Sequence, residues 1–153
     1  MPLYHLDRLI ASMGIVIITE GEKDVETMER LGYTATTSPN GAGSKWRKDF
    51  NEFFRCKNVL IIADNDEPGM KYALSAAEEV SRTTNAVKLI PSAEIYPQLK
   101  PKGDISDIAA ELGDEKTREL LTAAVKRTDK FSRSIVPTAA AEPVVLTEKP
   151  SEN

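Results

Sequence analysis

The chain has 153 residues, of which 41% are hydrophobic, and a formal net charge of −4, which suits one compact domain with a loose end rather than two full domains. One cysteine and one histidine exclude an internal disulfide and any His/Cys zinc site, and with it a zinc finger or a zinc hydrolase. No apolar run reaches the roughly 18 residues of a membrane helix and the first residues lack a secretory pattern, so we expect a cytoplasmic protein with no membrane partner and no zinc.

The first third of the chain predicts two strands with a helix between them. Residues 1–14 predict a short helix that leads into the domain. Residues 15–19 form a β-branched apolar run, typical of a strand buried on both faces. Apolar residues then recur at helical spacing up to Gly32, where the helix is expected to end. Residues 34–37 predict a second strand and residues 46–54 a second helix.

The next segment repeats the alternation of strand and helix. Residues 58–63 are as apolar as the first strand, a helix with one apolar face follows from Pro68, and residues 86–90 predict a fourth strand. Strands separated by helices imply right-handed crossovers. We therefore expect a Rossmann-like α/β domain over residues 15–127, with a central parallel sheet of about four strands and helices on both faces.

The last part of the domain predicts a loop and two helices. Residues 91–103 contain three prolines and are expected to form a loop. Helices are expected over residues 106–112 and 115–126, the second with Asp114 as its N-cap. Residues 128–153 have scattered prolines and no periodic apolar face, which predicts a disordered tail or an interdomain linker.

Acidic residues follow three of the predicted strands, at the edge where a parallel sheet places its functional crevice. Glu20 follows the first strand, Asp64 and Asp66 follow the third, and Asp104 comes after the fourth strand and its loop. Turns or helix caps explain any one of these residues, but a magnesium or manganese site explains them together, because a cation offsets the repulsion among unpaired carboxylates. The same repulsion raises carboxyl pKa values, which would let Glu20 exchange a proton near neutral pH.

Three segments resemble the signatures of the Toprim domain. They are EGEKD at residues 20–24, DNDEPG at residues 64–69 and GDISD at residues 103–107, within a resemblance that spans about residues 15–112. This catalytic domain occurs in bacterial-type primases, phage and mitochondrial primase-helicases, topoisomerases of types IA and II, recombination proteins and some nucleases. The resemblance implies the Toprim fold.

The resemblance also implies roles for single residues. Glu20 matches the family's glutamate, a general acid/base in phosphoryl transfer and in some members a metal ligand. Asp64 and Asp66 match its paired magnesium-binding aspartates, and Asp104 matches a later acidic position of the primase branch. We expect Glu20, Asp64 and Asp66 to be catalytic, and these three with Asp104 to hold Mg²⁺ or Mn²⁺. Two further acids are expected to support the ligands without binding the metal: Asp24 and Asp107.

The loop at residues 38–46 is rich in glycine and basic at its end. It matches neither the Walker A pattern nor GxGxxG, but it looks like the corresponding loop of phage and plasmid primase-like Toprim proteins. It is either a phosphate-binding loop for nucleotides or nucleic acid, or a flexible turn with solvated basic residues. Trp46 is expected in the core rather than stacked on a base. The candidate nucleotide- or nucleic-acid-binding residues are Gly41, Gly43, Lys45, Arg47, Lys48 and Lys102.

Together these features favour a magnesium-dependent primase-type Toprim domain that performs nucleotidyl transfer for primer synthesis in DNA replication, in a phage or mobile element. Its expected partners are nucleotides, DNA or RNA, and the zinc-binding or helicase domains that accompany such primases. A metal-dependent Toprim nuclease and a non-catalytic nucleic-acid or nucleotide-binding module remain open. A response-regulator receiver fits less well, because its paired acids follow the first strand, and no tyrosine has the context of a topoisomerase nucleophile.

Overall fold

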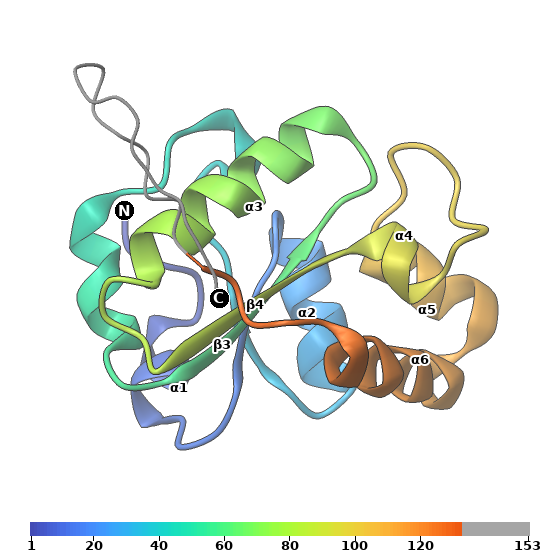
Figure 1. The fold of residues 1–153 in the computed structure, drawn as a ribbon, viewed down its shortest axis with the longest axis horizontal. Coiled ribbons are helices and arrows are strands. Elements are labelled where there is room, and N and C mark those ends of the chain that lie inside the picture. The colour runs from blue at the N-terminus through green and yellow to red at the C-terminus, as the bar shows by residue number, and fades with distance from the viewer. Residues whose placement is uncertain (133–153) are drawn as a thin grey trace, which may run out of the picture.

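The computed structural model describes residues 1–132, which form an α/β domain with helices on both sides of a sheet (Figure 1). The sheet has four strands in the order β2-β1-β3-β4. The middle strands are β1 (Val16–Ile18) and β3 (Asn58–Ala63), and the edge strands are β2 (Thr34–Thr36) and β4 (Ala86–Pro91). All three pairings are parallel. The predicted α/β class with a four-stranded parallel sheet is confirmed.

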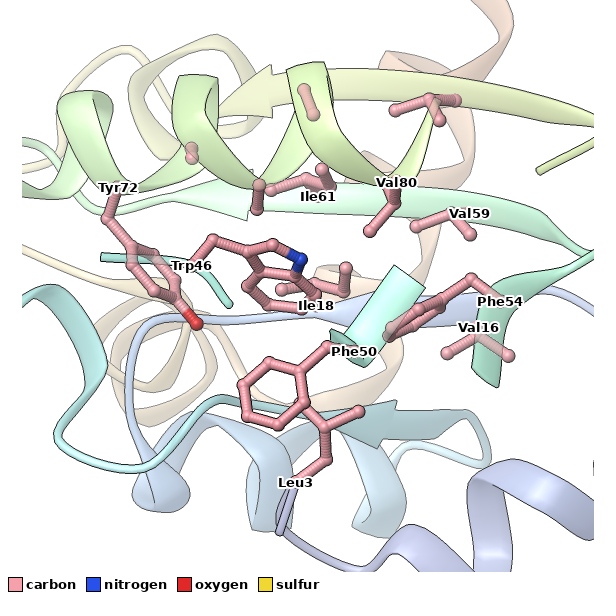
Figure 2. Packing of buried hydrophobic residues seen from close by; sticks show 14 of the residues in the cluster. Leu3, Val16, Ile18, Trp46, Phe50, Phe54, Val59, Ile61, Tyr72 and Val80 are labelled. Carbon is pink, nitrogen blue, oxygen red and sulfur yellow. The ribbon is translucent and has the colours of Figure 1, made fainter. Parts of the chain in front are cut away.

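One face of the sheet packs against α3 (Glu67–Val80) and the 3₁₀ helix η2 (Lys48–Phe54). Figure 2 shows Trp46 within this cluster, with its ring 5.4 Å from that of Phe50 and 5.7 Å from that of Phe54. The side chain of Trp46 is only 4% exposed, which confirms its predicted place in the core. The predicted α-helix over residues 46–54 is wrong in type and start, because only Lys48–Phe54 is helical, with 3₁₀ geometry.

The opposite face packs against α2 (Glu22–Arg30), α5 (Ile105–Leu112) and α6 (Asp114–Arg127). Neighbouring strand residues alternate between the two faces. Ile17 and Leu60 therefore point toward these helices, while the residues on either side of them point toward α3. Helices cover both faces of the sheet, as predicted (Figure 1). The apolar side chains of both middle strands are buried.

Two details of the C-terminal region differ from the prediction. The proline-rich segment at residues 91–103 contains a four-residue helix, α4 (Ser92–Ile95), and the buried Ser92 hydroxyl at its start donates a 2.6 Å hydrogen bond to the Ala63 carbonyl at the end of β3. Asp114 is the first residue of α6 and not its N-cap. The preceding Gly113 takes that place with a φ of 88°, in the region that favours glycine.

The predicted lead-in helix is present as α1 (Leu6–Ala11). Fewer of its apolar residues are buried than the spacing indicates. Leu9 is fully buried, whereas Ile10 is 60% exposed and Met13, just after the helix, is 100% exposed. The helix therefore adds only a small area to the core.

Segments before α1 and after α6 lie along the two edge strands. The amide of Tyr4 donates to the carbonyl of Thr37 beyond β2, and the amide of Phe131 donates to the carbonyl of Val87 in β4. Phe131 also packs on the core cluster under α3. Within the described part of the chain, no helix is long and apolar enough to cross a membrane. Most of the predicted tail, residues 133–153, lies outside the described residues.

Candidate metal centre

The acidic loops meet at the switch point of the sheet. The connections from β1 and β3 leave toward opposite sides, so the carboxyl ends of these two neighbouring strands flank a crevice. Glu20 follows β1 and Asp64 follows β3 directly. A cleft of about 510 Å³ opens here, and Asp24 and Asp104 also line it.

Three carboxylates form the centre of this cleft. Asp24, Asp64 and Asp104 each place one oxygen within 4.8 Å of the others. Asp24 lies in the first turn of α2, Asp64 directly follows β3, and Asp104 is the N-cap of α5. Three different segments of the sequence therefore supply one all-oxygen cluster.

The cluster is electrostatically costly by itself. Burial raises the pKa of Asp24 to about 6, and the Asp104 carboxylate acts in the same direction against the hydrogen bond from Ser106. Burial and the adjacent Glu20 carboxyl raise the pKa of Asp64 well above its ordinary value. Among residues 1–132, the three carboxylates make one ion pair, with Lys23, whose Nζ lies 3.1 Å from Asp104 Oδ2 and whose side chain is 68% exposed.

Glu20 sits at the wall of the cleft with one oxygen lacking a partner. Its Oε1 is buried and accepts no hydrogen bond from any residue that the structure describes. Its backbone carbonyl accepts a 2.8 Å hydrogen bond from the Thr37 hydroxyl. A Cβ at Gly69 would lie 2.9 Å from Oε1, and one at Gly41 would lie 2.3 Å from the Glu20 carbonyl oxygen. Both glycines therefore allow the chain to approach Glu20 closely.

These donors fit a hard divalent cation. Magnesium and manganese prefer carboxylate oxygens, and an orphaned buried oxygen beside three close carboxylates is otherwise unfavourable. A cation would offset both costs. Cysteine and histidine, the typical zinc ligands, do not line the cleft.

Two of the predicted site residues cap helices. Asp66, predicted as a metal ligand, is the N-cap of α3, and its Oδ1 accepts a 2.7 Å hydrogen bond from the amide of Gly69. Asp66 does not belong to the three-oxygen cluster. Asp107 and Asp104 form a capping box, in which each carboxylate accepts a hydrogen bond from the other residue's amide, at 3.0 and 2.9 Å. Asp107 therefore fixes the direction of the Asp104 carboxylate.

Asn65 is a positioning residue that the sequence did not single out. Its amide donates to the Gly103 carbonyl at 2.8 Å and its carbonyl accepts from the Lys102 amide at 2.7 Å. Its side chain donates to the Lys100 carbonyl at 2.9 Å. These bonds hold the proline-rich loop against the end of β3 and bring Asp104 to the cleft. The only local signal was its place between two predicted ligands.

A hydroxyl chain holds Asp24 from the other side. The Ser106 hydroxyl donates a 2.5 Å hydrogen bond to Asp24 Oδ1. The Thr27 hydroxyl lies 2.7 Å from the Ser106 oxygen and donates to it, because the single Ser106 proton already points to Asp24. No local pattern predicts this contact, since 82 positions separate Ser106 from Asp24.

The glycine-rich loop forms one wall of the cleft. It contains a short 3₁₀ helix, η1 (Gly41–Gly43), whose residues line the cleft. Tyr72 of α3 anchors the loop, because its hydroxyl accepts a 3.1 Å hydrogen bond from the Ser38 amide and lies 2.8 Å from the Ser38 hydroxyl. No sequence pattern indicated that Tyr72 supports this loop.

The predicted phosphate-binding cations differ in their surroundings. Arg47 makes a 2.6 Å ion pair with Asp49, donates to the Met1 carbonyl and stacks over the ring of Phe50 at 4.6 Å. Its guanidinium is therefore already engaged. The remaining candidates are exposed and make no ion pair with any residue up to 132: Lys45, Lys48 and Lys102.

Comparison with known proteins agrees with this geometry. The sequence profile of the Toprim domain matches residues 15–95. The Gene 57 protein of Mycobacterium phage D29 is 34% identical over 119 residues, which cover 76% of this chain and 69% of that protein. The DNA primase DnaG of Aeropyrum pernix is 28% identical over 127 residues, but these cover only 30% of its length.

The structure of the DnaG catalytic core has a similar fold, with a TM-score of 0.61 and 21% identity over 84% of this chain and 40% of that one. The chain thus spans less than half of these two primase chains. The profile covers more than half of the sequence and includes β1, β3 and the loops that carry Glu20 and Asp64. The chain belongs to the Toprim family and is related to primases.

Proposed function

We propose that this Toprim domain performs nucleotidyl transfer with Mg²⁺ or Mn²⁺, as the catalytic part of a primase-like protein that makes primers in the DNA replication of a phage or mobile element. The observation that carries the proposal is the cluster of three carboxylates beside the buried, unpartnered Glu20 oxygen. The phage relative and the archaeal primase support the biological setting.

The three clustered residues have one role in this proposal. Asp24, Asp64 and Asp104 hold the cation, which when bound neutralises phosphate charge and orients a nucleotide. Asn65 and Asp107 keep Asp104 in place, and Ser106 keeps Asp24 in place. The carboxylates are thus preorganised by bonds from three elements.

Glu20 has a separate role. It lines the same cleft, and its Oε1 has no hydrogen-bond donor among the described residues. We assign to this carboxyl group the role of accepting a proton from an attacking hydroxyl group, which requires the side chain to turn toward the cleft because Oε1 is buried. The hydrogen bond from the Thr37 hydroxyl to the Glu20 backbone carbonyl, together with the close approach of Gly41, fixes the Glu20 backbone during this proton transfer.

The proposal includes further domains. The chain spans 30% of the archaeal primase and 40% of the DnaG catalytic-core chain. Zinc-binding and helicase domains are the partners expected from the primase resemblance, and single-stranded DNA or RNA and nucleotides are the expected substrates.

A gel assay tests the activity. The purified chain is incubated with labelled single-stranded DNA, ribonucleotides and deoxyribonucleotides, and MgCl₂ or MnCl₂. Asp64→Asn removes a clustered carboxylate, and Asp7→Asn, at an exposed position of α1, is the matched control. We expect new or longer products with the wild type and the control, and none with Asp64→Asn.

Other outcomes would change the assignment. Metal-dependent shortening of the DNA that is lost in Asp64→Asn would make the protein a nuclease. Calorimetric binding of magnesium by the wild type without any change of the DNA, also in the presence of a zinc-binding primase domain, would overturn catalysis and leave a binding module.

A further inference from the structure

A second groove runs beside the acidic cleft. It has a volume of about 650 Å³, and Ala42 and Gly43 line both it and the cleft. Along α3 it is lined by Glu67, Lys71 and Ser75, among others. The two depressions therefore meet over the small side chains of the η1 loop.

The groove contains hydrogen-bond donors without partners. The ammonium groups of Lys45 and Lys71 and the hydroxyl of Ser75 line it, and none of them has a hydrogen bond or ion pair with any of residues 1–132. Both lysines are exposed. In contrast, the nearby Arg47 and Arg55 are paired with Asp49 and Glu52. Unpaired positive charge thus gathers in the groove, where Glu67 is the only acidic lining residue in the described part of the chain.

The groove has the shape of a track along a helix. The two donors on α3, Lys71 and Ser75, are spaced by four residues, so they lie on one face of the helix with a rise of about 6 Å between them, and the acidic Glu67 lies one turn before them. That spacing resembles the distance between neighbouring phosphates of an extended single strand. A row of positions suits a polymer better than a single phosphate group.

We propose that this groove binds the phosphodiester backbone of single-stranded nucleic acid, so that the strand enters the acidic cleft over Ala42 and Gly43. The inference rests on the proposed function and extends it, since it names the path of the strand. The acidic cleft without a cation repels a polyanion, whereas Lys45 and Lys71 attract it. The class of ligand is a phosphate anion, and its source is the strand rather than a free nucleotide.

The test measures strand binding without catalysis. A fluorescein-labelled oligothymidylate is titrated with protein in EDTA, without nucleotides, and followed by fluorescence anisotropy at several NaCl concentrations. The test variant is Lys45→Gln/Lys71→Gln. The matched control is Lys116→Gln/Lys126→Gln, which removes two exposed charges from α6 on the other face of the sheet.

The expected effect follows from counterion release. Each lost phosphate contact lowers the slope of log K against log salt by about 0.7 for a single strand, so the double variant should lower it by about 1.4. At 0.1 M salt this corresponds to weaker binding on the order of 25-fold. The control should change neither quantity. Because both groove lysines are exposed and unpaired, circular dichroism should show an unchanged fold.

Three results would overturn the proposal. The test variant could bind the oligothymidylate with the same affinity and the same salt dependence as the wild type. The control could lose as much affinity as the test variant, which would indicate bulk charge. A labelled nucleoside triphosphate could lose affinity in the test variant while the oligothymidylate does not, which would make the groove a nucleotide site. If the groove lysines prove necessary for strand binding but the protein makes no primers, the proposed function is wrong and the proposed groove stands.

Discussion

Replacing Asp24 by asparagine is expected to stabilise the metal-free protein while it weakens cation binding. Asp24 is 3% exposed, and burial raises its pKa from 3.8 to about 6. In the unfolded chain, the Asp24 carboxyl group has its ordinary pKa. Asparagine has nearly the same shape, carries no charge and can still accept the hydrogen bond from Ser106. The folded state therefore no longer carries this buried charge.

The size of the effect follows from the pKa. A rise from 3.8 to about 6 is about 2 pKa units, which costs the folded state about 3 kcal/mol at pH 7. Because the folded-state pKa is raised, the stability that Asp24 contributes is complete below 3.8 and is lost as the pH rises through about 6. The advantage of the variant should therefore narrow from about 3 kcal/mol at pH 7 to about 2 kcal/mol at pH 5. Loss of the Asp24 charge should also lower the pKa of Asp64, because Asp24 helps to raise it.

Urea unfolding at pH 7 and pH 5 in EDTA measures this difference, with Asp7→Asn as the control for loss of an exposed acid. Repeating the titrations in MgCl₂ should stabilise the wild type by mass action and the Asp24→Asn variant much less. The reasoning is refuted if the variant is less stable than the wild type in EDTA at pH 7. It is also refuted if the gap between them is the same at both pH values.

Three further predictions concern the surroundings of the cluster. Gly69→Ala should lower the free energy of unfolding by about 1–3 kcal/mol, because its Cβ would press on the Glu20 Oε1 atom, and a thermal melt equal to wild type would contradict this. Asp66→Ala should cost about 1 kcal/mol through loss of the α3 N-cap, whereas Asp66→Asn keeps a capping oxygen; equal urea midpoints for the two variants would exclude a capping role. Ser106→Ala should weaken magnesium binding about 10- to 100-fold in calorimetry, because Asp24 loses its hydroxyl donor, and unchanged affinity would show that the bond does not position the carboxylate.

The buried strands were predictable because each side of the sheet is covered by helices. β3 occupies the six predicted positions, Asn58–Ala63, since burial on both faces leaves one uninterrupted apolar run. The helix type at residues 46–54 was not predictable in this way. Phe50 and Phe54 are four residues apart, which places them on one side of an α-helix but about 120° apart around a 3₁₀ helix. The spacing therefore favoured the α-helix, whereas in the structure both rings pack against Trp46 from a 3₁₀ helix.

For the site, the sheet rule predicted that Glu20, Asp64 and Asp104 would gather at one edge, and the structure brings them to one cleft. The different positions of Asp24 and Asp66 could not be predicted from spacing. Asp66 starts a helix, so its carboxylate turns to the α3 amides, while Asp24 is turned into the cluster by a hydroxyl far away in the sequence. Such side-chain directions depend on tertiary contacts that leave no local pattern.

The long sequence separation within the cluster has a consequence for biosynthesis. Asp24 and Asp64 are translated before Asp104, and the hydroxyl that orients Asp24 belongs to a residue 82 positions later. A nascent chain can therefore pair β1, β2 and β3 on the ribosome while the cluster still lacks one carboxylate and one hydroxyl. A cation that needs all three carboxylates would bind only after α5 has left the exit tunnel. It would therefore stabilise the domain after the strands have paired, and it would not start their pairing.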